Sequence, residues 1–169
     1  PSPARTGQGA GIYEVVRNWP KYPEGKKLGN LHGDIAADSK GKVYIATGGT
    51  IQVIAADGTY EGELRAKNGN KAFRGVHGMK VRKIDGEETL IIAMPGVKRV
   101  VNVRFDGTVV WQIIGPPKVE EMYGSISQYN PTDLDVAPDG RVYIVDGYGK
   151  SLVHVYDKDR NYLKTFGGK

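Results

Sequence analysis

The chain has 169 residues, with 24 glycines, 9 prolines, no cysteine and a formal net charge of +5 at pH 7. The lack of cysteine excludes disulfides, cysteine-built zinc sites and a cysteine nucleophile, and no segment approaches the roughly 20 apolar residues that a membrane helix needs. Basic and acidic residues are interspersed, and the densest basic group is only Lys21, Lys26 and Lys27. We therefore expect neither a nucleic acid nor a membrane as a partner.

The first predicted element is a strand over 11–19, GIYEVVRNW. It resembles the closing strands of the later repeats, TYEGELR, TVVWQII and NYLKTF. No partner strands precede it in the sequence. We therefore expect an orphan strand that belongs to none of the repeats.

Three similar segments follow, within the predicted boundaries 28–66, 74–115 and 129–168. Each has an early turn, a second turn and an apolar closing strand. The early turns lie near Gly41, Gly86 and Gly140, and the second turns lie at Asp57-Gly58, Asp106-Gly107 and Asp157-Lys158. A repeat spacing of roughly 45 to 55 residues is close to that of propeller blades.

Each repeat divides into four short strands, which the third copy shows best as DLDVA, RVYIV, LVHVYD and YLKTF. A four-stranded sheet buries both faces only by stacking on neighbours, as propeller blades do. The predicted fold is an all-β propeller of three four-stranded blades plus the orphan strand, forming half of a six-bladed ring. The remaining blades would come from the rest of a longer chain, and until they pack, the first and third blades would expose apolar faces.

Two of the three histidines, His32 and His77, occupy the same position in successive repeats, in LHGD and VHGM. Equivalent positions at the entry to the innermost strand should converge at the mouth of the central channel. Converging neutral imidazoles suit Zn²⁺, but two ligands are too few, so a third would come from the remaining blades. Alternatively, each imidazole forms a hydrogen bond with a neighbouring loop.

Tyr148 lies in VDGYGKS, the turn between the second and third strands of its repeat. That turn opens to the same end of a propeller as the strand entry, so Tyr148 could stand near His77. A tyrosine near a divalent cation loses its proton more easily and can act as a base. The alternative is a loop tyrosine that packs on the next blade.

Other polar residues have weaker claims to a site. His154, within LVHVYD, is expected to pack between blades or lie at the surface. Asp133, Asp135 and Asp146 could ligate a hard cation, or they could cap turns.

Three segments carry a resemblance to a known family: NWPKYPEGKKLGNLHGDIAAD, VHGM and YNPTDLDVAPDGRVYIVDGYGKS. They resemble the NHL-repeat propellers related to peptidyl-α-hydroxyglycine α-amidating lyase and its bacterial relatives. The resemblance implies a six-bladed ring with zinc held by three histidines and calcium inside the channel. It assigns His77 to zinc, Tyr148 to catalysis, and the main-chain carbonyls of Asp34 and Met79 to calcium.

The chain departs from the family pattern at three positions. Gly48 stands where the family has a functional arginine, Gly149 replaces the cysteine after the tyrosine, and His32 is an additional histidine and a candidate zinc ligand. Two functions are therefore expected. One is a secreted or periplasmic metal-dependent lyase that cleaves a C–N bond in a small or peptide-derived substrate, and the other is a non-catalytic propeller that binds a peptide, a glycan or a partner protein.

Overall fold

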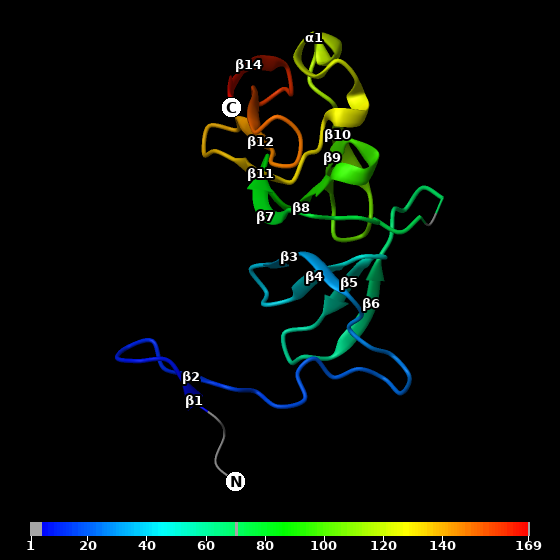
Figure 1. The fold of residues 1–169 in the computed structure, drawn as a ribbon. Helices are drawn as coiled ribbons and strands as arrows, with labels where there is room; N and C mark the ends of the chain where they lie inside the picture. Colours follow the sequence, from blue (N-terminus) through cyan, green and yellow to red (C-terminus); the bar gives the residue numbers. More distant parts are fainter. Residues whose placement is uncertain (1–4, 70, 169) are drawn as a thin grey trace.

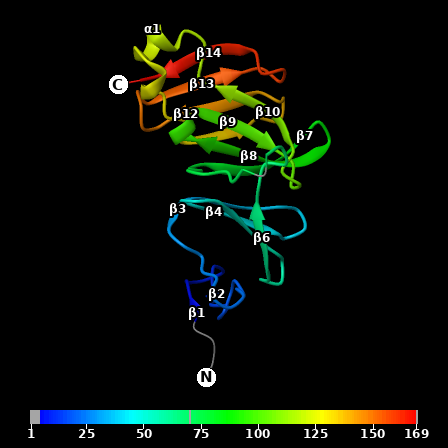
Figure 2. The same ribbon diagram turned by 90° about the vertical axis from the view of Figure 1, so that its right-hand side faces the viewer.

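The computed structural model describes residues 5–69 and 71–168, whose strands form three four-stranded antiparallel sheets and one small hairpin (Figure 1). Within each large sheet the strands follow one another in chain order. The sheets are successive propeller blades, and the arc that they form is not closed (Figure 2). The predicted all-β propeller fold is therefore confirmed. No helix in the described part of the chain is long and apolar enough to cross a membrane.

Blade 1 places alternate apolar side chains toward blade 2, because neighbouring residues of a strand point to opposite faces. Tyr44, Ala46 and Ile51 are buried in the core between these two blades. The four strands of blade 1 are β3 (Leu31–Ala37), β4 (Val43–Thr47), β5 (Ile51–Ile54) and β6 (Tyr60–Leu64).

Blade 2 is buried on both faces, so its second strand is almost continuously apolar. Leu90 and Ile92 face blade 1, whereas Ile91 and Ala93 face blade 3. The strands are β7 (Met79–Ile84), β8 (Glu87–Met94), β9 (Arg99–Val103) and β10 (Val109–Ile114), with the 3₁₀ turn η1 (Pro95–Val97) after β8.

Blade 3 is reached through a short helical connection that the sequence pattern did not predict. Tyr123 from this connection is buried in the core between blades 2 and 3. The connection contains α1 (Val119–Tyr123) and η2 (Ile126–Gln128), and the strands of blade 3 are β11 (Asp133–Val136), β12 (Val142–Asp146), β13 (Leu152–Tyr156) and β14 (Tyr162–Gly167).

The predicted strand over 11–19 is much shorter than expected. Only Tyr13–Glu14 (β2) is extended and paired, and its partner is Arg5–Thr6 (β1), in a hairpin away from the three blades (Figure 1). Asn18 adopts a φ of +57°, which interrupts extended backbone before the strand could reach 19. The segment belongs to no blade, as predicted.

Residues 19–28, which we call the strap, cross the outer face of blade 1. Gln52 on β5 donates through its side-chain amide to the carbonyls of Lys27 and Leu28, at 3.2 and 3.1 Å. The Tyr22 hydroxyl donates to the Gln52 side-chain oxygen. The expectation that this face of blade 1 is open is thus wrong over β5, because the strap covers it.

Candidate functional site

The three predicted site residues lie together at one end of the blades. His32 is on β3, His77 directly precedes β7, and Tyr148 lies in the turn between β12 and β13. The ring centroids of His77 and Tyr148 are 4.9 Å apart, and those of His32 and His77 are 5.9 Å apart. Three blades therefore each contribute one side chain to this group.

His77 has a defined tautomer. Its Nδ1 lies 2.9 Å from the Thr132 carbonyl oxygen, which only accepts, so Nδ1 carries a proton that it donates. In the neutral ring, Nε2 then has the lone pair, and the Tyr148 hydroxyl 2.7 Å away donates to it. A histidine fixed through Nδ1 to a backbone carbonyl, so that Nε2 carries the lone pair, has the tautomer typical of metal-ligating histidines.

The glycine after each of these two histidines is required by close packing between blades. A Cβ on Gly33 would lie 2.5 Å from the Val76 carbonyl oxygen, and one on Gly78 would lie 2.6 Å from the Thr132 carbonyl oxygen. These distances are too short for any side chain. The repeated His-Gly pair therefore combines a site residue with a packing residue.

A network around Asp146 holds the turn that carries Tyr148. The buried carboxylate accepts from the amides of Asn130, Gly149 and Lys150, at 3.0, 2.8 and 2.8 Å. These bonds use Asp146 as a turn cap, which is the second of its two predicted roles. The network fixes the backbone on both sides of Tyr148, whose side chain remains 61% exposed.

His32 is less constrained than His77. Its side chain is exposed and forms no hydrogen bond with any other described residue. Its ring meets His77 edge-on, with an interplanar angle of 89°. It is therefore near enough to contribute to a shared site, but nothing in this part of the chain fixes its orientation.

Charged residues on the innermost strands form two groups of ion pairs between blades. The Lys80 ammonium lies 2.8 Å from an Asp34 oxygen and 3.1 Å from an Asp133 oxygen. Arg82 pairs with Asp135 through two hydrogen bonds of 2.7 and 2.8 Å. Asp133 and Asp135 are therefore engaged in ion pairs.

The Asp34 carboxylate is held in its ionised form. Partial burial acts to raise the pKa of Asp34, but the Lys80 ammonium and the amides of Ile35 and Met79 together lower it. The Met79 amide donates to Asp34, so this amide points away from β8. In an antiparallel strand the amide and the carbonyl of one residue point to the same side, so the Met79 carbonyl also points away from β8. The predicted calcium would meet this carbonyl, yet the Lys80 ammonium already neutralises the nearest carboxylate. Calcium at Asp34 and Met79 stays a prediction, and the ion pair weighs against it.

The zinc prediction fits the donor chemistry better. Within 5–69 and 71–168, no three histidine, aspartate or glutamate side chains are grouped closely enough to hold a metal ion. His77 Nε2 and the Tyr148 oxygen nevertheless offer a nitrogen and an oxygen donor at one point, with His32 nearby. Zinc at His77 and His32 stays a prediction that needs at least one further ligand.

The open hollow around these residues has a volume of about 370 Å³. Its walls include both His-Gly pairs and the two acidic residues that pair with Lys80. The residues that line it are His32, Gly33, Asp34, His77, Gly78, Thr132 and Asp133.

Sequence reasoning missed two parts of this site. Thr132 supplies the carbonyl that sets the His77 tautomer. Lys80 of blade 2 supplies the positive charge that pairs with Asp34 of blade 1 and Asp133 of blade 3. A backbone acceptor leaves no mark in a sequence, so Thr132 could not have been found. Lys80 could have been noticed, since it lies on a predicted innermost strand and such strands line the channel.

The fold places the chain in the class of β-propellers. The known structures that are similar to it share the fold at low sequence identity, so they support the fold and no particular function. No protein-family model and no curated protein matches the chain. Among solved structures, a candidate exported protein from Bacteroides fragilis is similar with a TM-score of 0.59 at 11% identity, over 89% of this chain and 41% of that one.

Two further structures are similar over almost the whole chain. A protein of unknown function from Bacteroides caccae matches with a TM-score of 0.54 at 12% identity, over 94% of this chain and 49% of its own. Apo AztD from Citrobacter koseri matches with a TM-score of 0.54 at 13% identity, over 98% of this chain and 42% of its own. The chain thus spans less than half the length of each of these three proteins.

Proposed function

We propose that the chain forms one side of a metal-dependent, lyase-like site at the mouth of a propeller channel. The observation that carries this proposal is the link between His77 and Tyr148, in which Nδ1 is fixed by the Thr132 carbonyl and Nε2 meets the tyrosine hydroxyl at 2.7 Å. The resemblance to NHL-repeat amidating lyases adds independent support at the same two residues.

In this proposal His77, through the Nε2 that now meets Tyr148, and His32 beside it would hold a zinc ion, which would supply Lewis-acid polarisation of a substrate oxygen. Tyr148, which would lose its own proton more easily beside the cation, would then accept a proton from the hydroxyl of an α-hydroxyglycine-type substrate. The O–H electrons would form the new carbonyl as the C–N bond breaks, and the nitrogen would leave with the bonding pair and take up the proton that Tyr148 accepted. Exposure of the Tyr148 side chain lets such a substrate reach it from solvent.

We further propose that additional blades complete the ring and supply the remaining ligand. The similar structures are more than twice as long as the part that they share with this chain. One of them is described as exported, which supports a secreted or periplasmic location. The proposed substrate is a small molecule or a peptide.

The test uses the whole protein and two substitutions. His77→Ala should lower the zinc content measured by elemental analysis, because water cannot replace a protein ligand at equal affinity. Tyr148→Phe should leave the zinc content intact and lower the rate of cleavage of an α-hydroxyglycine peptide by about 10²- to 10⁴-fold, the usual contribution of a general base.

Tyr143→Phe is the matched control, because Tyr143 lies on β12 outside the hollow. It should change neither zinc content nor rate. Zinc that is lacking in the parent protein, or unchanged in the His77 variant, would contradict the metal site.

A non-catalytic binding module is the second candidate, and Gly48 favours it. The family resemblance places a functional arginine at this position, and here there is no side chain. If the parent protein binds zinc and a peptide but does not cleave the α-hydroxyglycine peptide, this second function is the correct one.

A further inference from the structure

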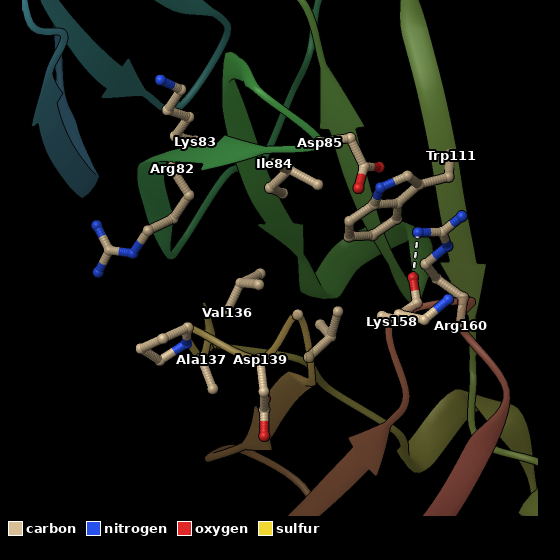
Figure 3. A pocket seen from close by; sticks show the side chains of 13 residues that line it. Arg82, Lys83, Ile84, Asp85, Trp111, Val136, Ala137, Asp139, Lys158 and Arg160 are labelled. Atoms are coloured by element: carbon tan, nitrogen blue, oxygen red, sulfur yellow. Dashed lines mark hydrogen bonds between the residues drawn. The ribbon is translucent and has the colours of Figure 1, made fainter.

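A second cavity lies at the opposite end of β7, between blades 2 and 3, and has a volume of about 480 Å³ (Figure 3). Its walls come from the end of β7, from β10, from the turn after β11 and from the turn between β13 and β14. His77 and its partners lie beyond the other end of the same strand. The cavity is therefore separate from the site described above.

The inner wall of the cavity is apolar, and one polar atom in it is unpaired. Ile84, Val136 and Val142 line the wall. Figure 3 shows Trp111 at one side of the cavity. The buried Trp111 Nε1 has no hydrogen-bond partner among the described residues. Buried polar groups are nearly always paired, so this indole N–H is a donor that a ligand oxygen could satisfy.

The turn between β13 and β14 differs from its counterparts in the other blades at a strained position. The same five-residue turn closes blades 1 and 2, where the first amide donates to the fifth carbonyl, from Ala55 to Thr59 and from Arg104 to Thr108. The fourth residues there are Gly58 and Gly107, with φ values of 89° and 85°.

In blade 3 the equivalent turn runs from Asp157 to Asn161, and its fourth residue is Arg160 with a φ of 67°. A side chain in the left-handed region carries a backbone cost that glycine avoids, and such strain is retained mainly at functional sites. The Arg160 guanidinium lies over the Trp111 ring, 5.7 Å from its centroid, and donates to the Lys158 carbonyl (Figure 3).

The second residue of this turn also changes from apolar to charged. In blade 2 it is Phe105, which stacks on Tyr44 of blade 1 with centroids 5.0 Å apart and planes 15° apart. In blade 3 it is Lys158, which lines the cavity together with Arg160 and whose ammonium pairs with Asp159 at 2.9 Å. The turn has thus replaced a packing residue and a glycine by two basic residues, of which Arg160 forms no ion pair with a carboxylate of the described residues.

We propose that this cavity binds a small planar, apolar molecule that carries a single carboxylate. Ile84, Val136 and Val142 would cover the apolar body, and the Trp111 N–H and the Arg160 guanidinium would meet the carboxylate. Two acidic residues, Asp85 and Asp139, also line the cavity, and Asp139 is paired with Arg141. These carboxylates repel any anion, so only the one negative charge that Arg160 offsets is expected.

Among the described residues, the corresponding hollow between blades 1 and 2 is lined by neither a tryptophan nor an arginine. Ser39 there donates through its amide and hydroxyl to Glu88, and the Tyr44 hydroxyl donates to Asp38 at 3.4 Å. The chemistry that predicts a ligand is thus specific to blades 2 and 3.

The experiment titrates the ¹⁵N-labelled chain with 2-naphthoate and with its neutral isostere, 2-naphthamide. Two indole N–H signals are expected, from Trp19 and Trp111, and Trp19→Phe identifies them. The Trp111 signal should shift on addition of naphthoate, the Trp19 signal should not move, and naphthamide should bind at least about tenfold more weakly, since charge-assisted hydrogen bonds are roughly twice as strong as neutral ones.

Two substitutions separate binding from folding. Arg160→Gly restores the residue that the other blades use, so it should preserve or raise the melting temperature while weakening naphthoate binding at least about tenfold. Trp111→Phe keeps the ring under Arg160 but removes the N–H, and should also weaken binding. An unmoved Trp111 signal, equal binding of naphthamide, or full affinity in the Arg160→Gly variant would each overturn the proposal.

Discussion

His154 differs from the other two histidines because it is enclosed by the core between blades 2 and 3. Its side chain has no solvent exposure, with Nε2 at 2.7 Å from the Tyr123 hydroxyl and Nδ1 at 2.7 Å from the Thr165 hydroxyl. Burial lowers the pKa of His154 below 6.5, although the nearby Asp146 charge acts to raise it. The prediction that it packs between blades is confirmed.

This lowered pKa makes stability depend on pH. Above pH 6.5 His154 is neutral in both the folded and the unfolded chain, so it adds no pH dependence. As the pH falls through 6.5 toward the lower folded-state pKa, only the unfolded chain takes up the proton, and the free energy of unfolding decreases by up to about 1.4 kcal/mol per pH unit.

His154→Gln should remove this slope while leaving the other titrating groups in place. Urea unfolding of parent and variant between about pH 8 and pH 5 measures the difference. An NMR titration of the His154 ring measures its pKa in the folded protein directly. A midpoint at or above 6.5 in the folded protein would contradict the argument.

At the scale of single elements, the turn after β12 decides where Tyr148 stands. The Asp146 carboxylate binds three backbone amides of this region, and Gly149 leaves room for that carboxylate. A Cβ on Gly149 would lie 2.3 Å from one Asp146 oxygen and 2.5 Å from the Gln128 carbonyl oxygen. Gly149 thus helps to position Tyr148, because it leaves room for the carboxylate that holds this turn.

Gly149→Ala should therefore open the turn and break the hydrogen bond between Tyr148 and His77. The cost expected for overpacking is about 1–3 kcal/mol in the free energy of unfolding. Gly48→Ala is the matched control, because an added Cβ there meets nothing within 4 Å. Urea unfolding and the NMR signal of the His77 ring distinguish the two variants, and equal stability would show that the turn tolerates a side chain.

Repeat geometry was sufficient to predict that His77 and Tyr148 meet, because equivalent entries and turns lie at one end of every blade. The blades themselves were predictable for the same reason, since alternation and Asp-Gly turns are local signals. The strap was not, because 19–28 has no periodicity and its position depends on Gln52, far along the chain. The short helix α1 was missed because five residues are too few to show a helical period.

At the scale of the whole molecule, the two outer faces of the arc differ. On blade 1 the strap covers Gln52, and Lys26 of the strap pairs with Glu63 on β6 at 2.9 Å. On blade 3, Val145 and Phe166 lie in one row across the sheet and are 37% and 48% exposed. On blade 1 the exposed apolar side chains lie on the innermost strand, at Leu31 and Ile35, whereas an apolar row stays open across the sheet of blade 3.

We predict that the 169-residue chain associates through this face in solution. Val145→Lys should weaken the association, because it places a charge in the apolar row. Val110→Lys is the control, since Val110 is equally apolar and 44% exposed but lies on the outermost strand of blade 2. Sedimentation over a range of concentrations measures the effect, and a monomer at every concentration would contradict the prediction.

The strap also limits the symmetry of any such assembly. Head-to-tail stacking, in which the open face of one copy meets the opposite face of the next, produces filaments when the rotation does not close. Because the strap covers β5, the open face of blade 3 has less apolar surface to meet on blade 1 of another copy, which favours contact with its own equivalent. That contact is isologous and is satisfied by two copies related by a twofold axis, so the strap favours a closed pair over a filament.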